Sequence, residues 1–206
     1  MDDCCASKGS ELERLALRAD QRRVLKVVMA INTTLFAIEF SAGLIAGSAA
    51  LMADSIDMLG DALVYALSLY ALSRSDRWKA GAAMAKGGFI LLLGCAVLAD
   101  IALKLGSGVP PPSTIMLVFG GLAFAGNLAC LRLLWRFRDK DVNMASTFEC
   151  SRNDVFSNLG VLVAAGGVAL SRSPWPDLVV GALIAILFLR SATRVIGAAW
   201  PALKTA

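Results

Sequence analysis

Six apolar stretches, each of about 20 residues or more, follow one another along this chain and constrain its fold more than any other feature. A helix of about 20 apolar residues crosses the hydrocarbon core of a bilayer, and a soluble core of this size would not need so many. The sequence therefore predicts an all-α, polytopic membrane protein with six transmembrane helices in one domain over residues 25–200. The predicted spans are 25–45, 49–72, 80–105, 114–135, 143–170 and 177–199.

The basic residues set the expected topology of these spans. Six of them lie between Lys8 and Lys26, three more lie within residues 74–79, and another three within 136–140. The loops that fall on the other side carry only Lys104 and Arg172. By the positive-inside rule both termini are cytoplasmic, which suits a multi-pass protein of the cell (inner) membrane. The polar cytoplasmic leader, residues 1–24, is either a short helix at the membrane surface or a charged segment without a separate role.

Several functional classes are excluded by what the sequence lacks. It contains no histidine, so any metal site must use carboxylate, thiolate, amide or backbone groups. It also contains no G-x-x-x-x-G-K-[ST] motif, which excludes an ATP-driven pump encoded by this chain alone. The five cysteines include no C-x-x-C pair, and a disulfide framework is not expected. We expect neither enzymatic activity, a resident cofactor nor a nucleic-acid partner.

Acidic residues inside the second span are the strongest functional signal. Asp54, Asp57 and Asp61 lie within an otherwise apolar stretch. Acids at membrane depth are costly and usually mark a path for ions or protons. Asp57 and Asp61 are four residues apart, so on a helix they share one face.

The fifth span repeats this spacing with Cys150 and Asp154. Two helices that each contribute such a pair could supply the four ligands of a tetrahedral metal site, namely Asp57, Asp61, Cys150 and Asp154. Accessory contributions could come from Asp54, Asn153 and Asn158. The alternative for each acid is a structural pair with a basic residue, and Cys150 could instead be a small packing residue.

These motifs resemble the cation diffusion facilitator family of divalent-metal/proton antiporters over about residues 10–200. The matching features are Gly47-Ser48 and the aspartates of the second span, followed by Cys150, Asp154 and Asn158 in the fifth. The resemblance implies six spans, cytoplasmic termini, a transport site on two helices and export of metal from the cytoplasm. The expected partners are divalent metal ions, protons and the lipid bilayer, and a homodimer stays open.

This sequence departs from the family pattern in three places. Cys150 stands where zinc transporters of the family usually have histidine, and the loop after the fourth span lacks a histidine-rich run. No cytoplasmic metal-binding domain follows the sixth span, so the chain is similar to the shortened, membrane-only members, and no C-terminal soluble domain is expected. The departure at Cys150 leaves the transported metal open.

The chemistry of the four ligands supports metal and proton exchange independently of the resemblance. Four acidic groups cannot all ionise in an empty pocket of low dielectric constant, so they hold protons jointly. A divalent cation needs deprotonated ligands, and its entry therefore expels protons. The thiolate favours Zn²⁺ or Cd²⁺, whereas three carboxylates keep Fe²⁺ or Co²⁺ open. Zinc is the first expectation.

Two other functions stay open at this stage. A passive cation channel would use the same ligands without proton coupling. An intramembrane aspartyl protease also uses two aspartates in helices, but Gly60-Asp61 lacks the first glycine of the Gly-x-Gly-Asp signature. Arg190 and Arg194, one helical turn apart in the sixth span, are either interfacial side chains that snorkel to the membrane surface or counter-charges for buried acids.

Overall fold

The computed structural model describes residues 2–70, 76–106, 108–139 and 142–205. The side chains of residues 2–18 lie outside the described part, and with them the two thiols of Cys4 and Cys5. Part of the charged turn expected at residues 74–79 also lies outside it. The helices are α1 (Asp2–Ala46), α2 (Ala49–Tyr70), α3 (Asp76–Lys104), α4 (Ser113–Trp135), α5 (Val142–Ser171) and α6 (Trp175–Thr205).

The expected all-α class is confirmed, and the described residues form no strand. Five of the helices contain a segment long and apolar enough to cross a membrane, as judged across the described residues. The exception, α2, has 22 residues but carries Asp54, Asp57 and Asp61 in its middle. Because these acids lie in the middle of a span, the burial of α2 depends on its neighbours.

Two helices extend beyond the stretches that hydrophobicity marks. α1 continues without a break from the polar leader into the first span, and α6 runs through Pro201 to Thr205. The backbone hydrogen bonds of a helix do not depend on apolar side chains. The end of an apolar stretch therefore predicts where the membrane ends, and a helix can continue past that point.

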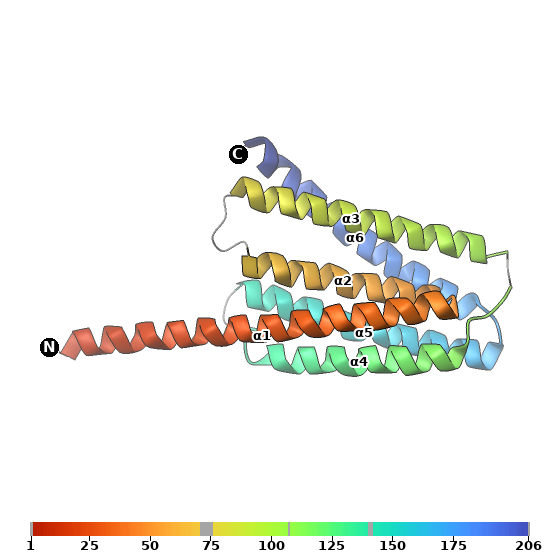
Figure 1. Cartoon of the computed structure of the whole chain (residues 1–206), viewed down its shortest axis with the longest axis horizontal. Coiled ribbons are helices and arrows are strands. Elements are labelled where there is room, and N and C mark those ends of the chain that lie inside the picture. Colours follow the sequence, from red (N-terminus) through yellow and green to blue (C-terminus); the bar gives the residue numbers. More distant parts are fainter. Residues whose placement is uncertain (1, 71–75, 107, 140–141, 206) are drawn as a thin grey trace.

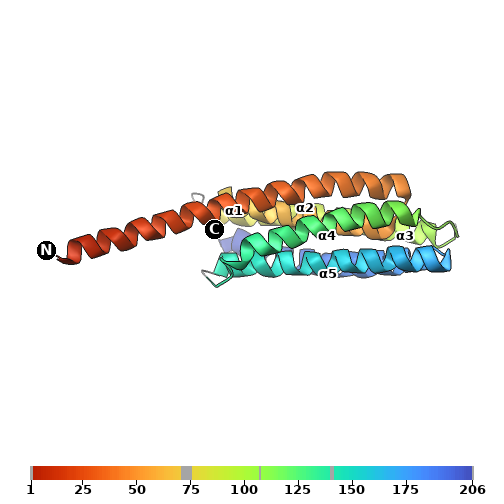
Figure 2. The same ribbon diagram turned by 90° about the horizontal axis from the view of Figure 1, so that it is seen from below.

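The six helices run up and down, so that the two termini lie at the same end of the bundle (Figure 1). The α1–α2, α3–α4 and α5–α6 connections lie at the opposite end, and α1 projects beyond the bundle toward its own N-terminus (Figures 1 and 2). This arrangement agrees with an even number of spans. That the end carrying the termini faces the cytoplasm stays a prediction.

Small residues let the helices around the centre pack closely. The largest cluster of buried apolar residues joins α2, α3, α5 and α6, and alanines make up a large part of it. In lipid, small residues at helix contacts favour association because they let the backbones approach. α1, α4 and the start of α5 enclose a second apolar cluster that includes Val28, Leu134 and Met144.

Candidate metal centre

The four predicted ligands line one cavity. Asp57 and Asp61 reach it from α2, and Cys150 and Asp154 reach it from α5. In both pairs the four-residue spacing puts the two side chains on one face of the helix, and the two faces meet at the same space. The cavity has a volume of about 650 Å³. Residues from α2, α5 and α6 form its walls.

The acidic side chains of the cavity differ in burial. Asp154 is 3% exposed and Asp61 is 9% exposed, whereas Asp57 and Cys150 are only half-buried. Asp61, Asp57 and Asp54 all lie close enough to Asp154 for their negative charges to repel its own. Removing several like charges from water is costly unless protons or a cation neutralise them. The cavity is therefore suited to bind a cation or to hold protons.

The four side chains do not form a closed coordination shell in this structure. Within the described ranges, no three acidic or thiol side chains approach closely enough to hold a metal ion. Coordination of a single ion would therefore require these side chains to turn inward from the cavity walls. Tetrahedral zinc ligands lie about 2.0–2.3 Å from the ion, a far smaller shell than a cavity of this volume.

The predicted accessory residues lie in different places. Asn153 lines the cavity, but Asp54 and Asn158 are not among its lining residues. Asn158 donates a hydrogen bond through Nδ2 to the backbone oxygen of Asp154, 2.7 Å away. Asp54 is 1% exposed, lies close to the charge of Asp57 and stands beside the carboxyl group of Glu39 on α1. Of the three, Asn153 alone faces the space where a cation would enter.

Three polar side chains of α1 and α4, namely Asn32, Glu39 and Asn127, are fully buried between the helices. Asn32 of α1 donates to the sulfur of Cys130 on α4 at 3.9 Å and to the carbonyl oxygen of Val28 at 3.0 Å. Neither amide atom of Asn127 has a hydrogen-bond partner among the described residues, and the same is true of both carboxylate oxygens of Glu39. Asn32 thus contacts a neighbouring helix, and Asn127 and Glu39 are buried without such a bond.

α6 supplies the rest of the cavity wall and its positive charge. Arg190 and Arg194 both line the cavity, a position that the interpretation as counter-charges for buried acids requires. Both side chains are exposed and share the cavity with three carboxylates, so that a role as counter-charges to the acids of α2 and α5 stays a prediction. The other lining residues are mostly apolar, namely Phe156, Ser157, Gly160, Val180, Leu183, Ile184, Leu187, Phe188 and Ser191.

One buried acid that the sequence reasoning did not single out is Asp177, in the first turn of α6. It is 1% exposed and accepts hydrogen bonds from the first turn of α2. An acid directly after the proline-containing turn at residues 171–176, together with Ser48 just before the second span, was the available signal. That the two helix ends face each other could not be read from that signal.

Comparison with known proteins gives a consistent result. Residues 25–203 match the cation efflux transmembrane domain. The chain is 26% identical over 179 residues to the metal cation efflux system protein CzcD of Cupriavidus metallidurans, a match covering 81% of this chain and 57% of the relative. It is 24% identical over 193 residues to the zinc transporter ZitB of Yersinia pestis, covering 86% and 61%. The chain thus spans about three fifths of the length of these relatives.

Proposed function

This chain belongs to the cation efflux family and is a multi-pass membrane protein, and from that premise we propose that it carries a divalent transition-metal ion across the bilayer in exchange for protons. The observation that carries the proposal is the cavity, in which the paired ligand-type residues of α2 and α5 face one another. The names of the relatives describe metal efflux and zinc transport, which supports export from the cytoplasm across the cell membrane. They favour transport over peptide hydrolysis by Asp61 and Asp154.

The proton exchange follows from the charge of the cavity. Asp57, Asp61 and Asp154 share it with the Cys150 thiol and two guanidinium groups. Carboxylates and a thiolate bind metal only in their deprotonated forms, so metal and protons compete for the same atoms. If the cavity opens to each side in turn, this competition couples metal movement in one direction to proton movement in the other.

Metal uptake into proteoliposomes is expected to depend on an imposed pH gradient. With Zn²⁺ outside and the interior more acidic, uptake should exceed that of proteoliposomes without a gradient, because protons that leave the vesicle down their gradient drive metal in. Adding an ionophore that equilibrates protons should return uptake to the level of proteoliposomes without a pH gradient. A metal flux unchanged by the ionophore would contradict antiport and favour the passive channel.

Cys150 is expected to set the metal preference. Replacing Cys150 with Ser exchanges a soft sulfur for a harder oxygen of similar size, so binding of Zn²⁺ and Cd²⁺ should weaken relative to Mn²⁺. We expect the ratio of Zn²⁺ to Mn²⁺ uptake to fall by about tenfold, within the range that changes near a metal produce. Competition between the two ions in the same vesicles measures that ratio directly.

A matched control for Cys150 is Cys130, which is fully buried between α1 and α4 and does not line the cavity. Cys130→Ser should leave the ratio of Zn²⁺ to Mn²⁺ uptake unchanged. An unchanged ratio in Cys150→Ser as well would assign Cys150 to packing and leave the fourth ligand to Asn153 or to water.

A further inference from the structure

The six helices divide into two packed groups with the cavity between them. α3 and α6 lie against each other along one side of the bundle, while α1, α2, α4 and α5 form the other side (Figure 1). The two groups meet where α6 contacts α2 and α5 and where α3 contacts α2. Because the cavity is bounded by α2 and α5 on one side and α6 on the other, any relative movement of the groups changes its access.

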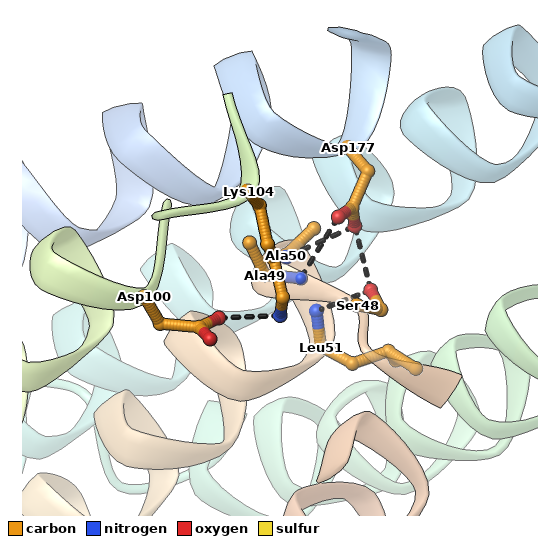
Figure 3. A network of polar contacts seen from close by, with 7 residues as sticks. All are labelled: Ser48, Ala49, Ala50, Leu51, Asp100, Lys104 and Asp177. Carbon is orange, nitrogen blue, oxygen red and sulfur yellow. Dashed lines mark hydrogen bonds and ion pairs between the residues drawn. The ribbon is translucent and has the colours of Figure 1, made fainter. Parts of the chain in front are cut away.

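One buried polar connection joins the two groups at the end of the bundle opposite the termini. The carboxylate of Asp177 on α6 accepts hydrogen bonds from the Ser48 hydroxyl at 2.6 Å, from the Ala49 N–H at 2.8 Å and from the Ala50 N–H at 3.1 Å (Figure 3). Ser48 in turn accepts a hydrogen bond from the Leu51 N–H at 3.2 Å. An acid from another helix thus caps the first turn of α2.

The turn between α1 and α2 presents these donors to α6. Gly47 has a φ of 65°, and this left-handed backbone lets the chain reverse between Ala46 and Ala49. The first N–H groups of a helix have no partner within the helix, and they carry its positive dipole end. A carboxylate is therefore the side chain best suited to bind there, and Asp177 satisfies two of these N–H groups at once.

Close backbone packing reinforces the same contact. Gly181 lies one turn after Asp177, and a Cβ atom built on it would stand 2.7–2.9 Å from backbone atoms of Ala49 and Ala50. The two helices therefore touch at backbone distance at this point. Asp57, the first cavity residue of α2, lies eight residues beyond Ala49, a rise of about 12 Å along the helix. The contact thus bounds the cavity on the side of the α1–α2 and α5–α6 turns.

We propose that Asp177 is a positioning residue that fastens α6 to the start of α2 and keeps the cavity closed toward the side of the α5–α6 turn. The proposal rests on the transport function proposed above, because a carrier must open its cavity to that side at some stage. Opening requires the three hydrogen bonds to Asp177 to break together. Water near the membrane surface can then bind the released N–H groups, so the connection is reversible.

The test uses the native Cys150 thiol, which lines the cavity, as a reporter of access. The full chain is reconstituted into vesicles of known orientation and exposed to a membrane-impermeant maleimide, and the labelled peptides are quantified by mass spectrometry. Asp177→Ala is expected to increase the labelling rate of Cys150 from the side of the α5–α6 turn by about fivefold or more, the change that loss of a typical helix cap corresponds to. Asp177→Glu, which keeps the carboxylate, should restore part of the protection.

The controls separate a released contact from general unfolding. Asp100→Asn removes one negative charge from the same end of the bundle. The ion pair of Asp100 with Lys104 lies within α3 and does not connect the two groups of helices (Figure 3). It should leave Cys150 labelling unchanged. Cys130 is fully buried, so its labelling reports unfolding. If Cys130 becomes labelled in Asp177→Ala, that variant is unfolded and Ser48→Ala is used instead. Ser48→Ala keeps both N–H bonds to Asp177, and the labelling rate of Cys150 should then rise by about twofold.

Two results overturn the proposal. One is unchanged labelling of Cys150 in folded Asp177→Ala, and the other is an equal increase from both sides of the membrane. Because the measurement reports access alone, its outcome is distinct from that of the transport test. If the wild-type protein moves no metal, transport is refuted. If Asp177→Ala in the same experiments shows increased labelling of Cys150 from one side only, the role of Asp177 is retained.

Discussion

Replacing Asp154 with Asn is expected to reduce metal uptake by about a hundredfold or more. Asp154 is the most buried acid of the cavity, and the charges of Asp57 and Asp61 act on it. Asparagine keeps the shape of the side chain but removes one negative charge and one competing proton site. Since changes even in groups that merely support metal ligands cost about 10–100-fold in affinity, the loss of a charged ligand should exceed that range.

Initial rates of Zn²⁺ uptake under a pH gradient, together with calorimetric Zn²⁺ binding in detergent, measure the effect of Asp154→Asn. The matched control is Glu149→Gln. Glu149 lies on the same helix, is exposed and forms an ion pair with Arg152 outside the cavity lining. The Glu149→Gln variant should transport Zn²⁺ at nearly the wild-type rate. Normal uptake by folded Asp154→Asn would show that the paired acids are structural, and the proposed metal centre would then be wrong.

Gly181→Ala is expected to lower the free energy of unfolding by about 3 kcal/mol, near the upper end of the usual cost of overpacking. The added methyl group would meet the carbonyl carbon and oxygen of Ala49 and the nitrogen of Ala50, and backbone atoms cannot rotate away as a flexible side chain can. α6 would have to move from α2, which would also lengthen the hydrogen bonds to Asp177. The change is small in volume but lies where the two helices are closest.

Heat-induced exposure of the buried Cys130 thiol in detergent, followed with a thiol-reactive dye, measures this loss of stability. Gly166→Ala on α5 is the control, because a Cβ atom there would meet nothing within 4 Å. It should be neutral or stabilise the protein by about 0.5–1 kcal/mol, as alanine does in place of glycine in a helix. Equal unfolding temperatures for Gly181→Ala and wild type would show that the α2–α6 contact adapts without cost.

The two predictions meet at α2, which shares the cavity with Asp154 of α5 and touches α6 at Gly181. α2 carries two of the four predicted ligands and is fastened at its start to α6. α6 contributes Arg190 and Arg194 to the cavity farther along. A shift of α6 against α2 would therefore change both the access to the cavity and the distance of the positive charges from the acids. This helix pair is thus where the proposed metal centre and the proposed closure meet.

The class of fold and the pairing of ligands followed from sequence because they depend on local chemistry. A run of about 20 apolar residues must become a helix in a bilayer, since every backbone polar group needs an internal partner. Acids within such a run are too costly to be incidental, and the four-residue spacing of Asp57 with Asp61 and of Cys150 with Asp154 aligns each pair on one helix face. Each of these inferences uses the sequence of a single segment and needs no contact with another.

What could not be inferred from sequence depends on contacts between distant segments. Arg190 and Arg194 were compatible with two locations until the packing of α6 against α2 and α5 placed both in the cavity. Asp54 lies on nearly the same helix face as Asp61, two turns before it, yet it does not line the cavity and instead lies against Glu39 of α1.

Asp177 shows the same limit most clearly. The N–H groups of Ala49 and Ala50 at the start of α2 require an acceptor. The carboxylate of Asp177, 128 and 127 positions farther along the chain, accepts from both. Its identity follows from the arrangement of all six helices. Local chemistry thus determined which residues can bind a cation, and helix packing determined which of them share a cavity and which hold it closed, because burial and distance are properties of the whole bundle.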